Sequence, residues 1–113
     1  MQRKEKWVGF DFDGTLFKRE KGDDIKTVGD PIYRMLELVK TYLTAGIKVK
    51  IFTARVSVDD PADVQLQTEL VQSACKQYLG QVLEVTCIKD VACLKIYDDI
   101  AVQVITNTGQ LVE

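Results

Sequence analysis

Apolar and polar positions follow two rhythms along the chain, one typical of strands and the other of helices. Residues 7–12 form a short apolar and aromatic run closed by Asp13-Gly14, which predicts a buried strand followed by a turn. Further strand patterns lie at 47–53, 82–87, 94–97 and 101–106, and Asn107-Thr108-Gly109 predicts a turn after the last of them. The pattern therefore predicts a sheet of about five strands.

Two stretches between these strands carry apolar residues at helical spacing. The first follows Asp30-Pro31, which fits an N-cap with proline in the first turn, and Gly46 can end it. The second starts at Asp60-Pro61 and ends before Gly80. Because strands alternate with helices, we expect a single Rossmann-like α/β domain over residues 1–113, with a parallel sheet and helices on both faces.

The order of the strands also predicts where a ligand binds. If the first three strands run in one direction and the strand at 94–97 lies on the other side of the first, these two strands flank a topological switch point. Open α/β sheets bind ligands in that crevice. The segment from the third strand to Asp98 is short, about ten residues, which is near the lower limit for a parallel crossover.

Among the features of the composition, the absence of histidine restricts the possible chemistry most. The 113 residues are 46% hydrophobic and 28% charged, which is ordinary for a globular domain. A formal net charge of −2 argues against a protein that mainly coats nucleic acid or membranes. The sequence has no histidine, which excludes Ser-His-Asp, Cys-His and His-ligated metal mechanisms. Catalysis would rest on carboxylates, lysine, arginine and hydroxyls.

The cysteines and the N-terminal segment indicate the cellular setting. Cys75, Cys87 and Cys93 lack CxxC spacing, so they predict reduced thiols and neither a disulfide framework nor a zinc site. Aspartates interrupt the first apolar run, so no signal peptide or membrane span can be placed there. We therefore expect a cytoplasmic protein without a membrane partner.

The DFDGTL segment at residues 11–16 is the most specific chemical signal in the sequence. Alternation along a strand would turn Asp11 and Asp13 to the same side of the backbone. Two neighbouring carboxylates repel each other, and this arrangement is costly unless a hard cation neutralises it. Because all these ligands are oxygens, the sequence predicts Mg²⁺ as the cofactor.

Four motifs in this order resemble those of the haloacid dehalogenase superfamily of phosphohydrolases. They are DFDGTL at 11–16, Thr53 in IFTAR, Lys89 in TCIKD, and Asp98-Asp99 in IYDD. The resemblance spans about residues 7–106, nearly the whole chain. It implies an enzyme that hydrolyses phosphate monoesters through an aspartyl-phosphate intermediate.

The resemblance also implies roles for the two aspartates of the first motif. Asp11 would attack phosphorus, because an aspartate with a reference pKa of about 3.9 is ionised at neutral pH without a partner base. Asp13 would act as general acid and then as base, while its backbone carbonyl helps to hold the metal. Dehalogenases of the superfamily lack this second acid, so its presence favours phosphoryl transfer.

The other motif residues would complete the site. Magnesium would be held by Asp11 and by Asp98 or Asp99. Thr53 would donate its hydroxyl to a phosphate oxygen, and Lys89 would stabilise the charge of the transition state. Plainer interpretations stay open. Thr53 simply ends a strand, Lys89 is an exposed loop lysine paired with Asp90 or Asp99, and Asp99 only supports the metal ligand or forms a salt bridge.

Access to the site is the last expectation. Many members of the superfamily insert a cap domain after the first or second motif, but segments 14–30 and 54–60 fall far below the roughly 50 residues of a minimal domain. We expect an open, capless site that takes a larger phosphorylated partner, such as a nucleic-acid end or a phosphoprotein, unless a second subunit of an oligomer covers it. Arg55 is a candidate substrate-binding residue, with an exposed loop arginine as the alternative. Further basic candidates are Lys18, Arg19, Lys21 and Lys26.

Two other functions fit parts of the pattern. A response-regulator-like receiver also groups aspartates, a threonine and a lysine around magnesium. Its acceptor aspartate ends a middle strand, however, where this chain has Thr53. A domain that only binds phosphate or a partner protein would not need the acids that this chain retains at positions 11, 13, 98 and 99.

Overall fold

The chain folds into one small α/β domain. The computed structural model describes residues 5–19 and 26–112, so Lys21 lies outside the described residues. The elements are β1 (Trp7–Phe10), α1 (Tyr33–Thr44), β2 (Lys48–Phe52), a 3-10 helix (Ala54–Val56), α2 (Pro61–Leu79), β3 (Glu84–Thr86) and β4 (Cys93–Tyr97). The α/β class expected from the pattern of strands and helices is confirmed.

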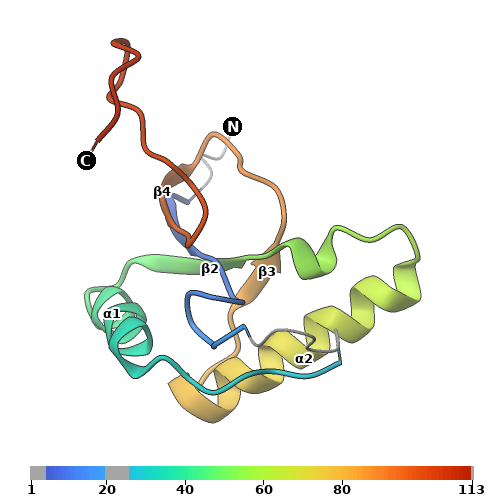
Figure 1. The fold of residues 1–113 in the computed structure, drawn as a ribbon. Coiled ribbons are helices and arrows are strands. Elements are labelled where there is room, and N and C mark those ends of the chain that lie inside the picture. The colour runs from blue at the N-terminus through green and yellow to red at the C-terminus, as the bar shows by residue number, and fades with distance from the viewer. Residues whose placement is uncertain (1–4, 20–25, 113) are drawn as a thin grey trace.

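The described strands form one parallel sheet in the order β3-β2-β1-β4 (Figure 1). β1 lies inside the sheet, with Trp7 opposite Lys48 of β2 on one side and opposite Cys93 of β4 on the other. The chain crosses from one half of the sheet to the other between β3 and β4. The predicted switch point between the first strand and the strand at 94–97 is therefore confirmed.

The ends of α2 follow the local signals in the sequence. The Asp60 side chain accepts a hydrogen bond from the Ala62 amide at 2.9 Å, and Gly80 closes the helix with a φ of 80°. The expected cap of α1 is wrong, because this helix begins at Tyr33 with Ile32 at its N-cap and without a side-chain cap. Pro31 instead pairs with Phe17 in an isolated bridge, which keeps the backbone extended for longer.

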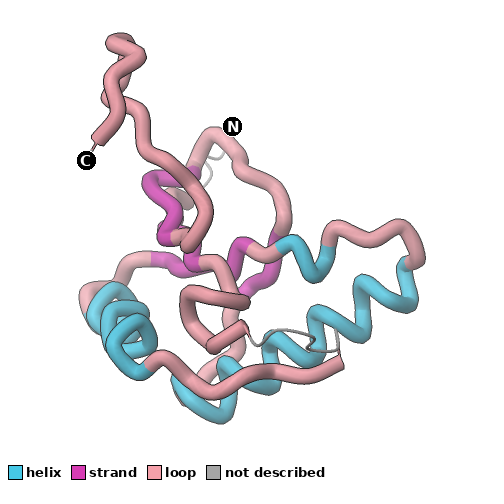
Figure 2. Tube along the Cα trace, in the orientation of Figure 1, coloured by secondary structure: helices cyan, strands magenta, loops and turns pink. Residues whose placement is uncertain are grey.

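Both helices pack on the same face of the sheet. Val8 and Phe10 of β1 share that face with their partners Val49 and Ile51 of β2. The same core contains buried residues of both helices, namely Leu36 and Val39 of α1 and Val71, Ala74 and Cys75 of α2. Helices thus flank the sheet as expected, but among the described residues both lie on one face, because the connection from β3 to β4 is a short loop that holds no helix (Figure 2).

A polar cover protects the opposite face of the sheet. Trp7 is fully buried there, and its indole N–H donates to Asp90 of the β3–β4 loop at 2.9 Å. The Lys50 ammonium lies 4.8 Å from the centre of the Trp7 ring and also pairs with Glu84 at 2.9 Å. Loop and strand side chains therefore bury this tryptophan where a helix was expected.

The strand expected at 101–106 is not part of the sheet. After β4 the chain forms an arm that extends away from the domain in Figure 1, with one bridge between Val104 and Leu111. Its expected turn is confirmed, with positive φ at Asn107 and Gly109. The alternating apolar pattern indicates a strand only where another strand offers hydrogen bonds, and residues 101–106 pair with no strand of the described sheet. No helix of the described residues is long and apolar enough to cross a bilayer.

Candidate active site

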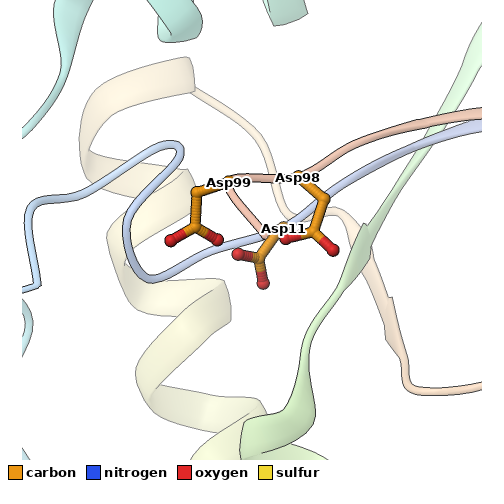
Figure 3. A group of neighbouring side chains, drawn as sticks. All are labelled: Asp11, Asp98 and Asp99. Carbon is orange, nitrogen blue, oxygen red and sulfur yellow. The ribbon is translucent and has the colours of Figure 1, made fainter. Parts of the chain in front are cut away.

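The carboxyl ends of β1 and β4 bring three aspartates together. Asp11 directly follows β1, and its amide donates to the Tyr97 carbonyl at the end of β4 at 2.9 Å. Asp98 and Asp99 directly follow Tyr97. One carboxylate oxygen from each aspartate lies within 4.8 Å of the others, and the side chains project to the same side of the strand ends (Figure 3). We call these three residues the aspartate cluster.

Aromatic packing fixes the end of β4 beneath the aspartate cluster. The Tyr97 ring stacks on Phe10 with a centroid separation of 4.6 Å, and its hydroxyl lies 2.6 Å from the hydroxyl of Tyr42 on α1. Each aromatic pair of this kind contributes about 0.5–1.5 kcal/mol beyond the burial of its area. The apolar core thus holds the edge strand in register with β1, and the position of Asp98 and Asp99 follows from it.

The cluster carries more negative charge than its neighbours balance. The pKa of Asp11 is raised to about 7, mainly by burial, then by its hydrogen bond with Asp99 and by the negative charges of Asp98 and Asp99. Burial also acts on Asp99, but its hydrogen bonds with Asp11 and Asp98 lower its pKa. A proton shared by this pair would therefore lie more on Asp11, and the charge of Arg19 also helps to keep Asp99 ionised.

The turn after β1 leaves no room for a side chain beside Asp99. The Phe12 carbonyl accepts the amides of Leu16 and Phe17 at 3.0 and 3.1 Å, which closes a tight turn. Gly14 has a φ of +85°, and a β-carbon on it would overlap the Asp99 carboxylate. The buried Thr15 points its hydroxyl at Asp11 at 3.5 Å. Sequence reasoning gave neither Gly14 nor Thr15 a role of its own, although both belong to the DFDGTL motif.

The Asp13 side chain does not join the aspartate cluster. β1 ends at Phe10, so strict alternation does not apply at Asp13, and its carboxylate binds Arg55 instead. Arg55 Nε lies 2.6 Å from one carboxylate oxygen, and a terminal nitrogen lies 2.8 Å from the other. The expected proximity of the Asp11 and Asp13 carboxylates is therefore corrected: the Asp13 carboxylate lies with Arg55 and not with the group at Asp11. A role for the Asp13 backbone carbonyl at the metal stays a prediction.

Arg55 is built into the protein rather than exposed on a loop. Its side chain is 11% exposed, and beyond Asp13 it donates to the Thr27 carbonyl at 2.7 Å and to the Gln67 side chain at 3.2 Å. Its guanidinium also lies over the Phe12 ring at 5.3 Å. The loop-arginine alternative is wrong, and the substrate-binding role stays a prediction. Sequence reasoning missed Gln67, whose only signal was a polar residue on the inner side of α2.

Thr53 lies at the same edge of the sheet, one strand away from Asp11. It is 3% exposed, its amide donates to the Thr86 carbonyl at 2.9 Å, and its hydroxyl oxygen accepts the Arg55 amide at 3.1 Å. A hydroxyl donates as well as accepts, so this geometry leaves the Thr53 proton to serve a phosphate oxygen. The strand-end position and the phosphate-binding role are therefore compatible.

Lys89 lies in the β3–β4 loop, where it lines a groove with residues of β4 and with Asp98. Burial raises the pKa of the nearby Cys93 thiol, and the Lys89 charge acts against that shift. The main influences on the pKa of Asp11 are burial, Phe12, Asp98 and Asp99. The structure thus brings Lys89 to the groove beside Asp98, and its contact with a phosphate at Asp11 stays a prediction.

The comparisons with known proteins do not assign the chain to a family. No family model matches the chain, and no curated protein or solved structure matches it. Membership of the haloacid dehalogenase superfamily therefore stays a prediction that rests on the motifs at Asp11, Thr53, Lys89 and Asp98-Asp99.

Proposed function

We propose that the protein is a magnesium-dependent phosphohydrolase that cleaves phosphate monoesters through an aspartyl-phosphate on Asp11. The observation that supports this most is the aspartate cluster, in which a motif after β1 meets a motif after β4 within 4.8 Å. The cluster lies at the switch point of the sheet, where open α/β folds bind ligands. Two ordinary surface turns would have no reason to bring their carboxylates so close together.

The cluster fits a hard divalent cation. Its oxygen donors come from Asp11, Asp98 and Asp99, which is the ligand type that Mg²⁺ prefers. Burial, and then the neighbouring Asp99 and Asp98, raise the pKa of Asp11 and so disfavour its ionised form, which a bound cation would favour again. Magnesium bound there would screen the repulsion between the anionic nucleophile and the anionic phosphate.

The proposed reaction has two steps, and Asp11 and Asp13 share them. An Asp11 carboxylate oxygen forms a bond to phosphorus while the bond to the ester oxygen breaks. Asp13, protonated at this point, gives that oxygen its proton and becomes the carboxylate that Arg55 bonds. Water then attacks phosphorus, Asp13 takes a proton from the water, and inorganic phosphate leaves as the carboxylate of Asp11 is restored. Thr53 and Lys89 would hold phosphate oxygens. A receiver-like switch would stop after the first step.

Phosphate release from a panel of substrates tests the proposal. The panel holds a terminally phosphorylated oligonucleotide, a phosphopeptide, a mononucleotide and a sugar phosphate, each with Mg²⁺, with Ca²⁺ and with excess chelator. We expect turnover with Mg²⁺ only, because the longer and looser coordination of Ca²⁺ misaligns the nucleophile and the phosphate. Asp59→Asn, at an exposed acid away from the cluster, is the matched control.

Each arm of this experiment can contradict a different part of the proposal. Undiminished hydrolysis in chelator would exclude metal dependence. Stoichiometric labelling of Asp11 without release of phosphate would favour the receiver-like switch. An open site predicts that kcat/KM is highest for a macromolecular substrate, and a preference of more than about tenfold for the mononucleotide or the sugar phosphate would overturn this part.

A further inference from the structure

Arg55 links three separate segments of the chain at the edge of the site. It holds both carboxylate oxygens of Asp13, the backbone carbonyl of Thr27, and the side chain of Gln67 on α2, which is itself 3% exposed. The 3-10 helix that carries Arg55 is fixed in turn, because the Thr53 hydroxyl caps it. Such a network holds the guanidinium in one position and leaves it little freedom to follow a mobile ligand.

The fork geometry of Arg55 decides which way the Asp13 carboxylate points. A planar guanidinium that bonds both oxygens of a carboxylate fixes its plane as well as its position, which a lysine does not do. Asp13 follows Asp11 by only two positions, so its carboxylate starts from the same turn as the cluster. With Arg55 in place, that carboxylate is held by a cation of the chain itself.

We propose that Arg55 is a positioning residue that keeps the Asp13 carboxylate out of the aspartate cluster and holds it for proton transfer. The proton-transfer half of this inference rests on the proposed phosphohydrolase function. The other half concerns metal binding alone: without Arg55, the Asp13 carboxylate becomes an additional oxygen ligand beside Asp11, Asp98 and Asp99. Arg55 therefore determines how many carboxylates bind the metal.

Kinetics of Arg55→Ala test the first half. We expect kcat for an alkyl phosphate to fall by about 10–100-fold with KM unchanged within about threefold, because only the proton to the leaving oxygen is misplaced. An aryl phosphate with an acidic leaving group should lose less than about threefold in the first step. Guanidinium at tens of millimolar should restore part of the loss and methylammonium should not, since only the former has the fork geometry. Arg34→Ala, at an exposed arginine of α1, is the matched control.

A double-mutant cycle separates positioning from a merely structural role. Asp13→Asn with Arg55→Ala should be no slower than Asp13→Asn alone, because both changes remove the same group from the reaction. Full additivity of the two losses would overturn the proposal. A tenfold rise in KM at unchanged kcat would overturn it as well, because Arg55 would then bind the substrate.

Metal binding tests the second half without any turnover. Calorimetric titration of the metal-free proteins with Ca²⁺ should show affinity at least about threefold tighter for Arg55→Ala than for the wild type, because a further carboxylate adds charge and a ligand. The gain should vanish in the double variant, which has no such carboxylate. Equal affinity in all three proteins would overturn the inference. A wild type that binds metal in this Asp13-dependent manner but hydrolyses no phosphate ester would refute the proposed function and leave this half standing.

Discussion

Asp11 and Asp13 are two positions apart in the chain and lie in opposite electrostatic surroundings. Asp11 meets two further carboxylates, and its pKa is raised to about 7, mainly by burial. Asp13 meets a guanidinium that bonds both of its oxygens, at 2.6 and 2.8 Å. The difference comes from distant segments, since Asp98 and Asp99 follow β4 whereas Arg55 follows β2.

This contrast shows how one short motif can place two carboxylates in different electrostatic surroundings. The carboxylate at Asp11 lacks a compensating cation among the described residues around it, so an external cation is the natural complement. The carboxylate at Asp13 has its counter-charge from the chain and needs none from solution. Removal of the Asp11 carboxylate, the Asp13 carboxylate or the cation should therefore change activity and stability to different extents. The largest expected effect comes first.

Asp11→Asn should abolish turnover, since a neutral amide cannot form the acyl phosphate. We expect a loss of at least several kcal/mol in transition-state stabilisation, which is a factor of more than about 10³ in rate. The fold should survive, because the carboxylate of Asp11 contributes repulsion rather than attraction to the metal-free state. Phosphate release and the thermal midpoint are measured together, and wild-type rates in a folded variant would end the assignment of the nucleophile.

Asp13→Asn should leave the metal bound and slow the reaction by about 10²–10⁴-fold for alkyl esters, the usual value of a positioned proton donor. Esters with acidic leaving groups need little protonation and should be slowed far less in the first step. Pre-steady-state rates for a matched series of leaving groups measure this contrast. Equal losses along the series would show that Asp13 is not the acid.

Magnesium should stabilise the folded protein, because the proposed site would hold the cation in the native cluster and not in the unfolded chain. At 100 times its dissociation constant, a ligand of this kind adds about 2.7 kcal/mol to the free energy of unfolding. Asp98→Asn and Asp99→Asn should each weaken the effect, and the larger loss identifies the direct ligand. Denaturant unfolding with Mg²⁺ and with chelator measures it, with Asp59→Asn as control. An equal gain in all variants would place the metal elsewhere.

The smallest effect concerns pH in the absence of metal. The pKa of Asp11 is 3.8 in an ordinary setting and about 7 in the fold, mainly because of burial, so between these values the folded state holds a proton that the unfolded state has lost. Stability from this group is fully present below the lower value and is lost as pH rises through the upper one. The lowered pKa of Asp99 acts only below this window.

Unfolding free energies of the chelated protein, measured from pH 4 to 8, check this sign. Asp11→Asn should flatten the profile across the window, and the change should be smaller than that caused by the metal because Asp11 is only half-buried. A wild-type profile as flat as that of the variant would contradict the shared proton. With Mg²⁺ present, the slope of the wild type should also decrease.

Local signals predicted what short-range physics decides. The caps at Asp60 and Gly80 and the turn at Asn107 follow from the preferences of single residues, and the motif after β1 indicated the acidic site. The partners of those residues could not be predicted in the same way. The choice of Arg55 as the counter-ion of Asp13 depends on where β2 ends in three dimensions. The strand pattern at 101–106 failed because the arm pairs with itself at Val104 and Leu111.

The position of β4 at the edge of the sheet has a consequence for the order of folding. Trp7 of β1 pairs with Lys48 across a moderate stretch of chain, but with Cys93 across most of the molecule. Closing the longer loop costs more entropy, so β4 is expected to dock last and, as an edge strand, to detach first in local openings. Asp98 and Asp99 directly follow β4, so they dock and detach together with it. The aspartate cluster is then assembled in the final folding step, and a cation bound to it would fasten the last strand to a sheet that is otherwise complete.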